Sequence, residues 1–130
     1  MIRWGSMAKI LIVDDEVEIT ELLKTVLEKD RHVVDYCHTG AEAMIHLATE
    51  SPDMVLVDVS MPEMDGYTFI SLLHENESTR EIPAIVLTGR DRLRDVFLPF
   101  SNVVDFIPKP FDVVDLRARV QAGLKKRETV

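Results

Sequence analysis

The strongest constraint on the fold is a regular alternation between two hydrophobic patterns along the chain. Five short runs are mostly apolar and contain many β-branched residues, which is typical of buried strands. These runs are residues 8–13, 33–37, 53–58, 83–88 and 103–107. Each run is followed by a segment that favours a helix. Strict alternation of this kind predicts one α/β domain, in which right-handed crossovers build a parallel sheet with helices on both faces.

The helical segments carry apolar residues three and four positions apart, as amphipathic helices do. They are predicted over residues 17–30, 40–50, 66–75, 91–98 and from Asp112, the N-cap of the last helix. The expected buried stripe of the first comprises Ile19, Leu22, Leu23, Val26 and Leu27. The stripe of the last comprises Val113, Leu116, Val120 and Leu124.

Two local signals predict where helices begin and end. Thr39 and Glu42 have the spacing of a capping box at the start of the second helix. Pro99 lacks a backbone donor and disfavours the α conformation in the residue before it. The fourth helix is therefore expected to stop near Phe97 or Leu98, leaving a short helix between the last two strands.

The composition is that of a soluble globular domain: 130 residues, 46% hydrophobic and 29% charged. A formal net charge of −8 disfavours direct binding of nucleic acid by this domain. The single cysteine, Cys37, fits a reducing compartment, and no apolar run approaches the roughly 20 residues of a membrane span, so we expect a cytoplasmic protein. Residues 8–127 are the predicted domain, 1–7 an N-terminal extension or cloning remnant, and 128–130 a C-terminal tail or the start of a linker.

Polar side chains follow four of the five predicted strands. Asp14, Asp15 and Glu16 follow the first strand, Asp58 ends the third, Thr88 ends the fourth, and Lys109 follows the fifth. In a parallel sheet the carboxyl ends of the strands meet at one edge, where such proteins bind their ligands. The sequence therefore predicts one shared site.

The residue types at this site indicate phosphoryl chemistry. Carboxylates a few ångströms apart repel one another by on the order of several kcal/mol, so they need Lys109 and a hard cation such as Mg²⁺ as counter-charges. One carboxylate can then attack phosphorus, while Lys109 and the Thr88 hydroxyl hold the phosphoryl oxygens.

The motifs IVDDE, DVSMPEMDG, LTG and KPF together resemble those of bacterial two-component response regulator receiver domains, such as chemotaxis regulators, over residues 8 to about 126. The resemblance implies a flavodoxin-like, doubly wound five-stranded sheet in the order 2-1-3-4-5. It also implies a phosphorylation-activated signalling domain. Such a domain has only weak self-catalysed phosphotransfer and autodephosphorylation, and is not a classical enzyme.

The same resemblance implies roles for individual residues. Asp58 is the expected phosphoacceptor, and the expected Mg²⁺ ligands are Asp14, Asp15, Asp58 and the main-chain carbonyl of Ser60. Thr88 and Lys109 are expected to contact the phosphoryl group, Thr88 and Phe106 to move together as a switch, and the Lys109–Pro110 bond to be cis. Asp65 is instead expected to cap the third helix.

The implied partners are a sensor histidine kinase or phosphotransfer protein as donor, and an output domain or target protein whose identity the sequence leaves open. A phosphorylation-dependent dimer is compatible with the resemblance; nucleic acid and membrane are not expected partners.

Two alternative functions are an aspartyl-phosphate phosphatase or phosphotransferase of the haloacid-dehalogenase type and a phosphorylation-independent pseudo-receiver. The first places its two acids as Asp-x-Asp, whereas Asp14 and Asp15 are adjacent; the second normally lacks the acidic pair, the acceptor or the lysine.

Overall fold

A computed structural model of the chain describes residues 8–89 and 91–128. The predicted extension at residues 1–7 and the last two residues of the predicted tail lie outside this description. In chain order the elements are β1 (Lys9–Val13), α1 (Val17–Glu28), β2 (Val33–Cys37), α2 (Gly40–Leu47), β3 (Met54–Asp58), α3 (Gly66–Glu75), β4 (Ala84–Thr88), the 3₁₀-helix η1 (Asp91–Phe97), β5 (Val103–Pro108) and α4 (Val113–Glu128).

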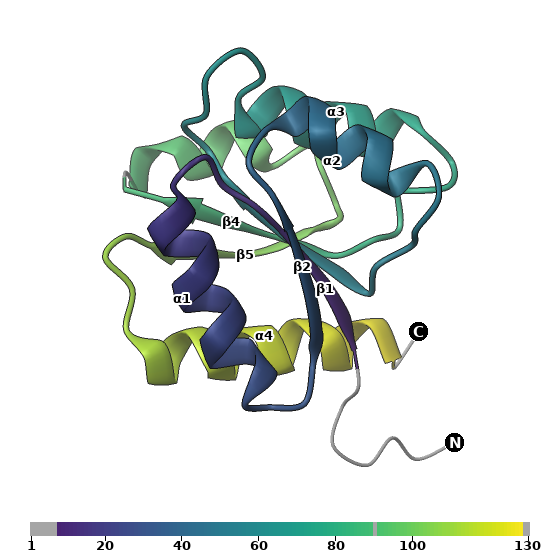
Figure 1. The fold of residues 1–130 in the computed structure, drawn as a ribbon. Helices are drawn as coiled ribbons and strands as arrows, with labels where there is room; N and C mark the ends of the chain where they lie inside the picture. The colour runs from purple at the N-terminus through teal and green to yellow at the C-terminus, as the bar shows by residue number, and fades with distance from the viewer. Residues whose placement is uncertain (1–7, 90, 129–130) are drawn as a thin grey trace.

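The five strands form one parallel sheet in the order β2-β1-β3-β4-β5, which confirms the predicted fold. Helices α1 and α4 cover one face of the sheet, and α2 and α3 cover the other (Figure 1). Among the described residues, no helix combines the length and the apolar character needed to cross a membrane.

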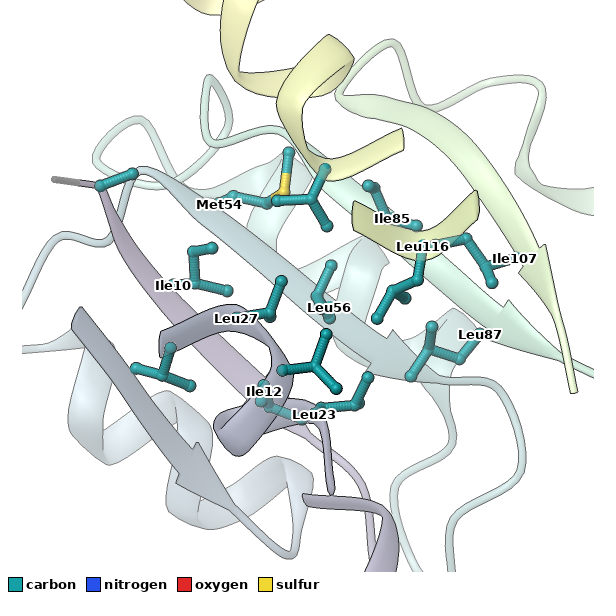
Figure 2. Packing of buried hydrophobic residues seen from close by; sticks show 14 of the residues in the cluster. Ile10, Ile12, Leu23, Leu27, Met54, Leu56, Ile85, Leu87, Ile107 and Leu116 are labelled. Atoms are coloured by element: carbon teal, nitrogen blue, oxygen red, sulfur yellow. The ribbon is translucent and has the colours of Figure 1, made fainter. Parts of the chain in front are cut away.

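Two hydrophobic cores lie on opposite faces of the sheet, because successive side chains of a strand point to opposite sides. Ile10 and Ile12 of β1 belong to the core under α1 and α4, which Figure 2 shows. Leu11 and Val13 belong to the core under α2 and α3. All five residues of β3 and of β4 are buried, which explains why these strands appear as continuous apolar runs.

The buried faces of the helices differ from the predicted stripes at two positions. Leu22 of α1 is 44% exposed, and Thr20 is buried instead. A buried hydroxyl is tolerated here because Thr20 Oγ1 donates to the Val17 carbonyl at 2.8 Å. Val113 is also exposed, since it is the first residue of α4 and lies beyond the sheet contacts of Leu116.

The predicted cap of α2 is confirmed, but its predicted end is wrong. Thr39 Oγ1 accepts a hydrogen bond from the Glu42 amide at 3.0 Å. The helix ends at Leu47 rather than residue 50, because Ala48 and Thr49 donate to carbonyls only three residues back.

The segment between β4 and β5 is a 3₁₀-helix, not the predicted α-helix, although it stops at Phe97 as expected. The segment has only seven residues, and Pro99 cannot continue it. Leu98 lies in the connection that follows, with 77% of its surface exposed.

Strand β5 contains a one-residue irregularity. Ala84 pairs with Val103, but Ile85 pairs with Asp105, so Val104 is an extra residue in the ladder. A bulge of this kind changes which face the following residues occupy. It places Phe106 opposite Val86 on the α2–α3 side and Ile107 opposite Leu87 on the α1–α4 side.

Candidate functional site

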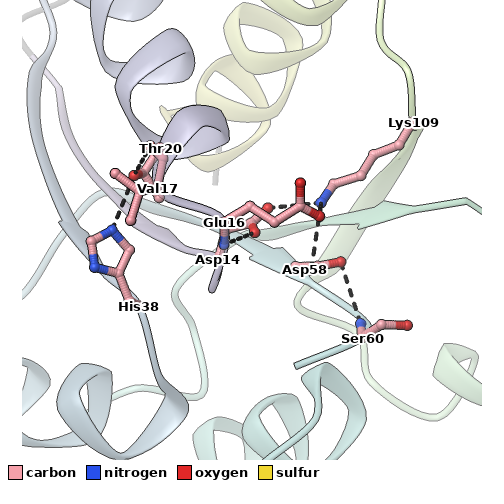
Figure 3. A network of polar contacts seen from close by, with 8 residues as sticks. All are labelled: Asp14, Glu16, Val17, Thr20, His38, Asp58, Ser60 and Lys109. Atoms are coloured by element: carbon pink, nitrogen blue, oxygen red, sulfur yellow. Dashed lines mark hydrogen bonds and ion pairs between the residues drawn. The ribbon is translucent and has the colours of Figure 1, made fainter. Parts of the chain in front are cut away.

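Three charged side chains meet at the carboxyl edge of the sheet (Figure 3). Asp14 directly follows β1, where its amide donates to the Cys37 carbonyl and so extends the strand pairing by one residue. Asp58 is the last residue of the neighbouring strand β3, and Lys109 directly follows β5. The Lys109 ammonium lies 2.8 Å from Asp14 Oδ2 and 3.5 Å from Asp58 Oδ2. Residues from the beginning, middle and end of the chain thus form one ion-pair cluster.

The cluster is buried enough to change the proton affinities of its members. Asp14 is fully buried and Asp58 is 5% exposed. Burial and the negative charge of Asp14 raise the pKa of Asp58 to about 6, although Lys109 and the Ser60 amide oppose the shift. Burial disfavours the charged form of Lys109, but the hydrogen bond with Asp14 and the surrounding carboxylates outweigh it and raise the pKa of the ammonium. The site therefore holds negative charge that is only partly neutralised.

A third carboxylate reaches the cluster, and it belongs to Glu16. One carboxylate oxygen each from Asp14, Glu16 and Asp58 lie within 4.8 Å of one another, and Glu16 Oε1 is 3.7 Å from Lys109 Nζ. Asp15, the ligand expected from the resemblance, is exposed and is not part of this group. The turn after β1 explains the difference, because the Glu16 amide donates to Asp14 Oδ1 at 2.9 Å and brings residue 16 back over the site. Sequence reasoning noted the acidic run but gave Glu16 no role.

The loop from Val59 to Asp65 is held close to Asp58. The Ser60 amide donates to Asp58 Oδ1 at 3.3 Å, and the Gly66 amide donates to the Val59 carbonyl at 2.9 Å. A Cβ atom on Gly66 would lie 2.5 Å from the Asp58 carbonyl oxygen, so only glycine permits this approach. Asp65 caps α3, accepting the Thr68 amide at 2.8 Å.

The remaining predicted residues surround the cluster on the β4–β5 side. Thr88 is buried at the end of β4, and its carbonyl accepts the Lys109 amide at 2.8 Å. The Lys109–Pro110 peptide bond is cis. Phe106 is partly buried against the core under α2 and α3, three residues before Lys109.

Comparison with known proteins identifies the family. The sequence model of the response regulator receiver domain matches residues 10–121. The chain belongs to this family. As a receiver domain it is a phosphorylation-activated signalling module.

Known relatives resemble the chain both in sequence and in structure. The chain is 39% identical over 121 residues to the CpxR homolog of Haemophilus influenzae, covering 92% of this chain and 52% of that protein. It is 32% identical over 125 residues to the DNA-binding dual master transcriptional regulator RpaA of a Synechocystis strain, covering 95% and 52%. The receiver domain of a signal transduction histidine kinase from Syntrophus aciditrophicus is 37% identical, with a TM-score of 0.81 and coverage of 92% and 91%. The receiver domain thus spans about half the length of these curated relatives.

The chemistry available to the site follows from its donor set. Closely spaced carboxylate oxygens suit a hard divalent cation, and the adjacent ammonium suits an anionic oxygen. Among the described residues, this cluster is the one group of acids, histidines or cysteines close enough together to hold a metal ion. The site can therefore bring together a carboxylate, a cation and a phosphoryl group.

Proposed function

We propose that Asp58 accepts a phosphoryl group from the phosphohistidine of a sensor histidine kinase or phosphotransfer protein. The observation that carries the proposal is the position of the Asp58 carboxylate, which ends a buried strand and lies 3.5 Å from the Lys109 ammonium. A structural ion pair would not need Asp14 as a second buried acid beside it.

The transfer makes an acyl phosphate. A carboxylate oxygen of Asp58 forms a bond to phosphorus, the bond between phosphorus and the donor imidazole nitrogen breaks, and the electron pair stays on the imidazole. Lys109 balances the charge of the phosphoryl oxygens, and the Thr88 hydroxyl contacts one of them. Phosphorylation then moves Thr88 and Phe106 together, which changes the surface that an output partner contacts.

Mg²⁺ is the proposed cofactor, held by carboxylates of Asp14, Asp15 and Asp58 and by the Ser60 main-chain carbonyl. When bound, the ion neutralises negative charge on the acids and on the phosphoryl group. The buried acids support this assignment, because Lys109 alone cannot balance them. The three-carboxylate group of the structure adds Glu16 to the residues able to contact the ion or its water.

The domain boundaries, partners and location follow as parts of the same proposal. Residues 8–127 form the receiver domain, which acts in the cytoplasm. The curated relatives are about twice as long, so the signal passes to an output domain or a separate target protein. Phosphorylation-dependent dimerisation is one form that this output can take.

Intact-mass measurement after incubation with acetyl phosphate and Mg²⁺ tests the proposal. The protein should gain one phosphoryl group, and Asp58→Asn should gain none. Glu63→Gln is the matched control, since Glu63 is an exposed acid of the same loop. Labelling of Asp58→Asn to the extent of the parent protein would contradict the proposal.

A further inference from the structure

The main chain at Phe106 is fixed on both sides. Its amide donates to Asp105 Oδ1 at 2.8 Å, and its carbonyl accepts Arg119 Nη1 at 3.1 Å. Arg119 is itself held by Asp105 and Asp115, which accept its other hydrogen bonds. Any change at Phe106 must therefore be a rotation of its side chain rather than a shift of β5.

Two side chains from η1 hold the ring. Phe97 meets it edge-on, with ring centroids 5.9 Å apart, and Phe97 is itself fixed in the core with 2% of its surface exposed. Arg94 places its guanidinium carbon 5.1 Å from the centroid of the Phe106 ring, within the range of a cation–π contact. Arg94 is exposed, so it covers the solvent side of a ring that is only partly buried.

The two contacts differ in how they can respond to movement. Phe97 also contacts Tyr67 of α3, at 5.9 Å between ring centroids, so it remains in place when Phe106 rotates. Arg94 interacts with the ring face that Phe106 would withdraw from solvent by turning inward. An inward rotation therefore breaks the contact with Arg94 while keeping the ring near Phe97.

We propose that Arg94 is a positioning residue that holds Phe106 in its half-buried position and so opposes the switch that accompanies phosphorylation. This inference rests on the proposed function, because Phe106 is taken as the switch residue. It adds a regulator to the proposed switch: the strength of one exposed cation–π contact sets how readily the domain accepts its activated conformation.

The test compares Arg94→Gln, Arg94→Lys and the control Arg80→Gln, in which an exposed arginine outside η1 loses the same charge. The first measurement is the affinity for the phosphoryl mimic beryllofluoride in the presence of Mg²⁺. Arg94→Gln should bind the mimic roughly two- to five-fold more tightly than the parent, the factor that corresponds to an exposed cation–π contact. Arg94→Lys should lie closer to the parent, and Arg80→Gln should match it.

The second measurement is the nuclear magnetic resonance spectrum of the Phe106 ring without the mimic. Arg94→Gln should shift the ring resonances toward those of the activated protein, whereas Arg80→Gln should leave them unchanged. Equal or weaker binding of beryllofluoride by Arg94→Gln overturns the inference and leaves the proposed function standing. Failure of the parent protein to bind beryllofluoride overturns the proposed function, and the inference with it.

Discussion

In metal-free buffer, the variant Asp58→Asn is expected to be more stable than the parent domain near neutral pH and equally stable in acid. Burial, together with the charge of Asp14, raises the pKa of Asp58 from 3.8 to about 6. The folded protein therefore binds this proton more tightly than the unfolded chain does. Between about pH 4 and about pH 6 the folded state carries more protons, so the parent loses stability as the pH rises through that window.

The size of the effect follows from the shift. The rise in the pKa of Asp58 from 3.8 to about 6 corresponds to about 3 kcal/mol of unfolding free energy. Solvent screens the Asp58 carboxylate little, because its side chain is only 7% exposed. Asparagine has nearly the shape of the protonated acid without the ionised form, so above about pH 6 the variant should gain up to this amount. For a domain of this size, that is a rise in melting temperature of roughly 10 °C.

Urea denaturation followed by circular dichroism, in EDTA and at a series of pH values, measures the difference between the two proteins. The difference in unfolding free energy between the two proteins is used because the contributions of groups that titrate equally in both cancel. Asp95→Asn is the control, because Asp95 is exposed in η1 and its substitution should give a small, flat profile. A profile for Asp58→Asn that is equally flat, or a loss of stability near neutral pH, would show that the carboxylate is not destabilised by burial and by Asp14.

Two further predictions concern the loop and the metal. Gly66→Ala should lower the unfolding free energy by about 1–3 kcal/mol, because the new Cβ collides with the main chain of Asp58 and Val59. In the control variant Gly89→Ala the new Cβ meets no atom within 4 Å, so the unfolding free energy should change far less. Urea denaturation of both variants measures the two effects, and equal effects would refute the prediction. Mg²⁺ at ten times its dissociation constant should stabilise the parent by roughly 1.4 kcal/mol, measured as an EDTA-reversible rise in melting temperature, and a rise that persists undiminished in Asp58→Asn would place the ion elsewhere.

The sequence predicts most of the fold because its hydrophobic pattern is regular. The ends of the apolar runs mark the ends of the strands, and in a parallel sheet these ends share one edge. This is why the sequence alone places Asp14, Asp58 and Lys109 together. Their order in the sheet came from the resemblance of four short motifs to a known family, since periodicity alone does not rank the strands.

What the sequence did not predict depends on local geometry. Whether Asp15 or Glu16 faces Lys109 is decided by the turn after β1, where the hydrogen bond from the Glu16 amide to the Asp14 carboxylate sets the direction of each side chain. The burial of Thr20 in place of Leu22 depends on a hydroxyl finding a carbonyl within its own helix. Periodic patterns record hydrophobicity and contain neither kind of information.

The bulge in β5 has a consequence for chain length. Deleting the codon for Val104 would leave a regular strand in which Asp105 still faces Ile85 and Phe106 still faces Val86. Deleting Ile107 instead would move Lys109 by one position and turn its ammonium away from the carboxylates. In an alignment with relatives that have one residue fewer in this strand, the gap therefore belongs at Val104. A gap placed after Phe106 would align Phe106 with the wrong residue of the relative.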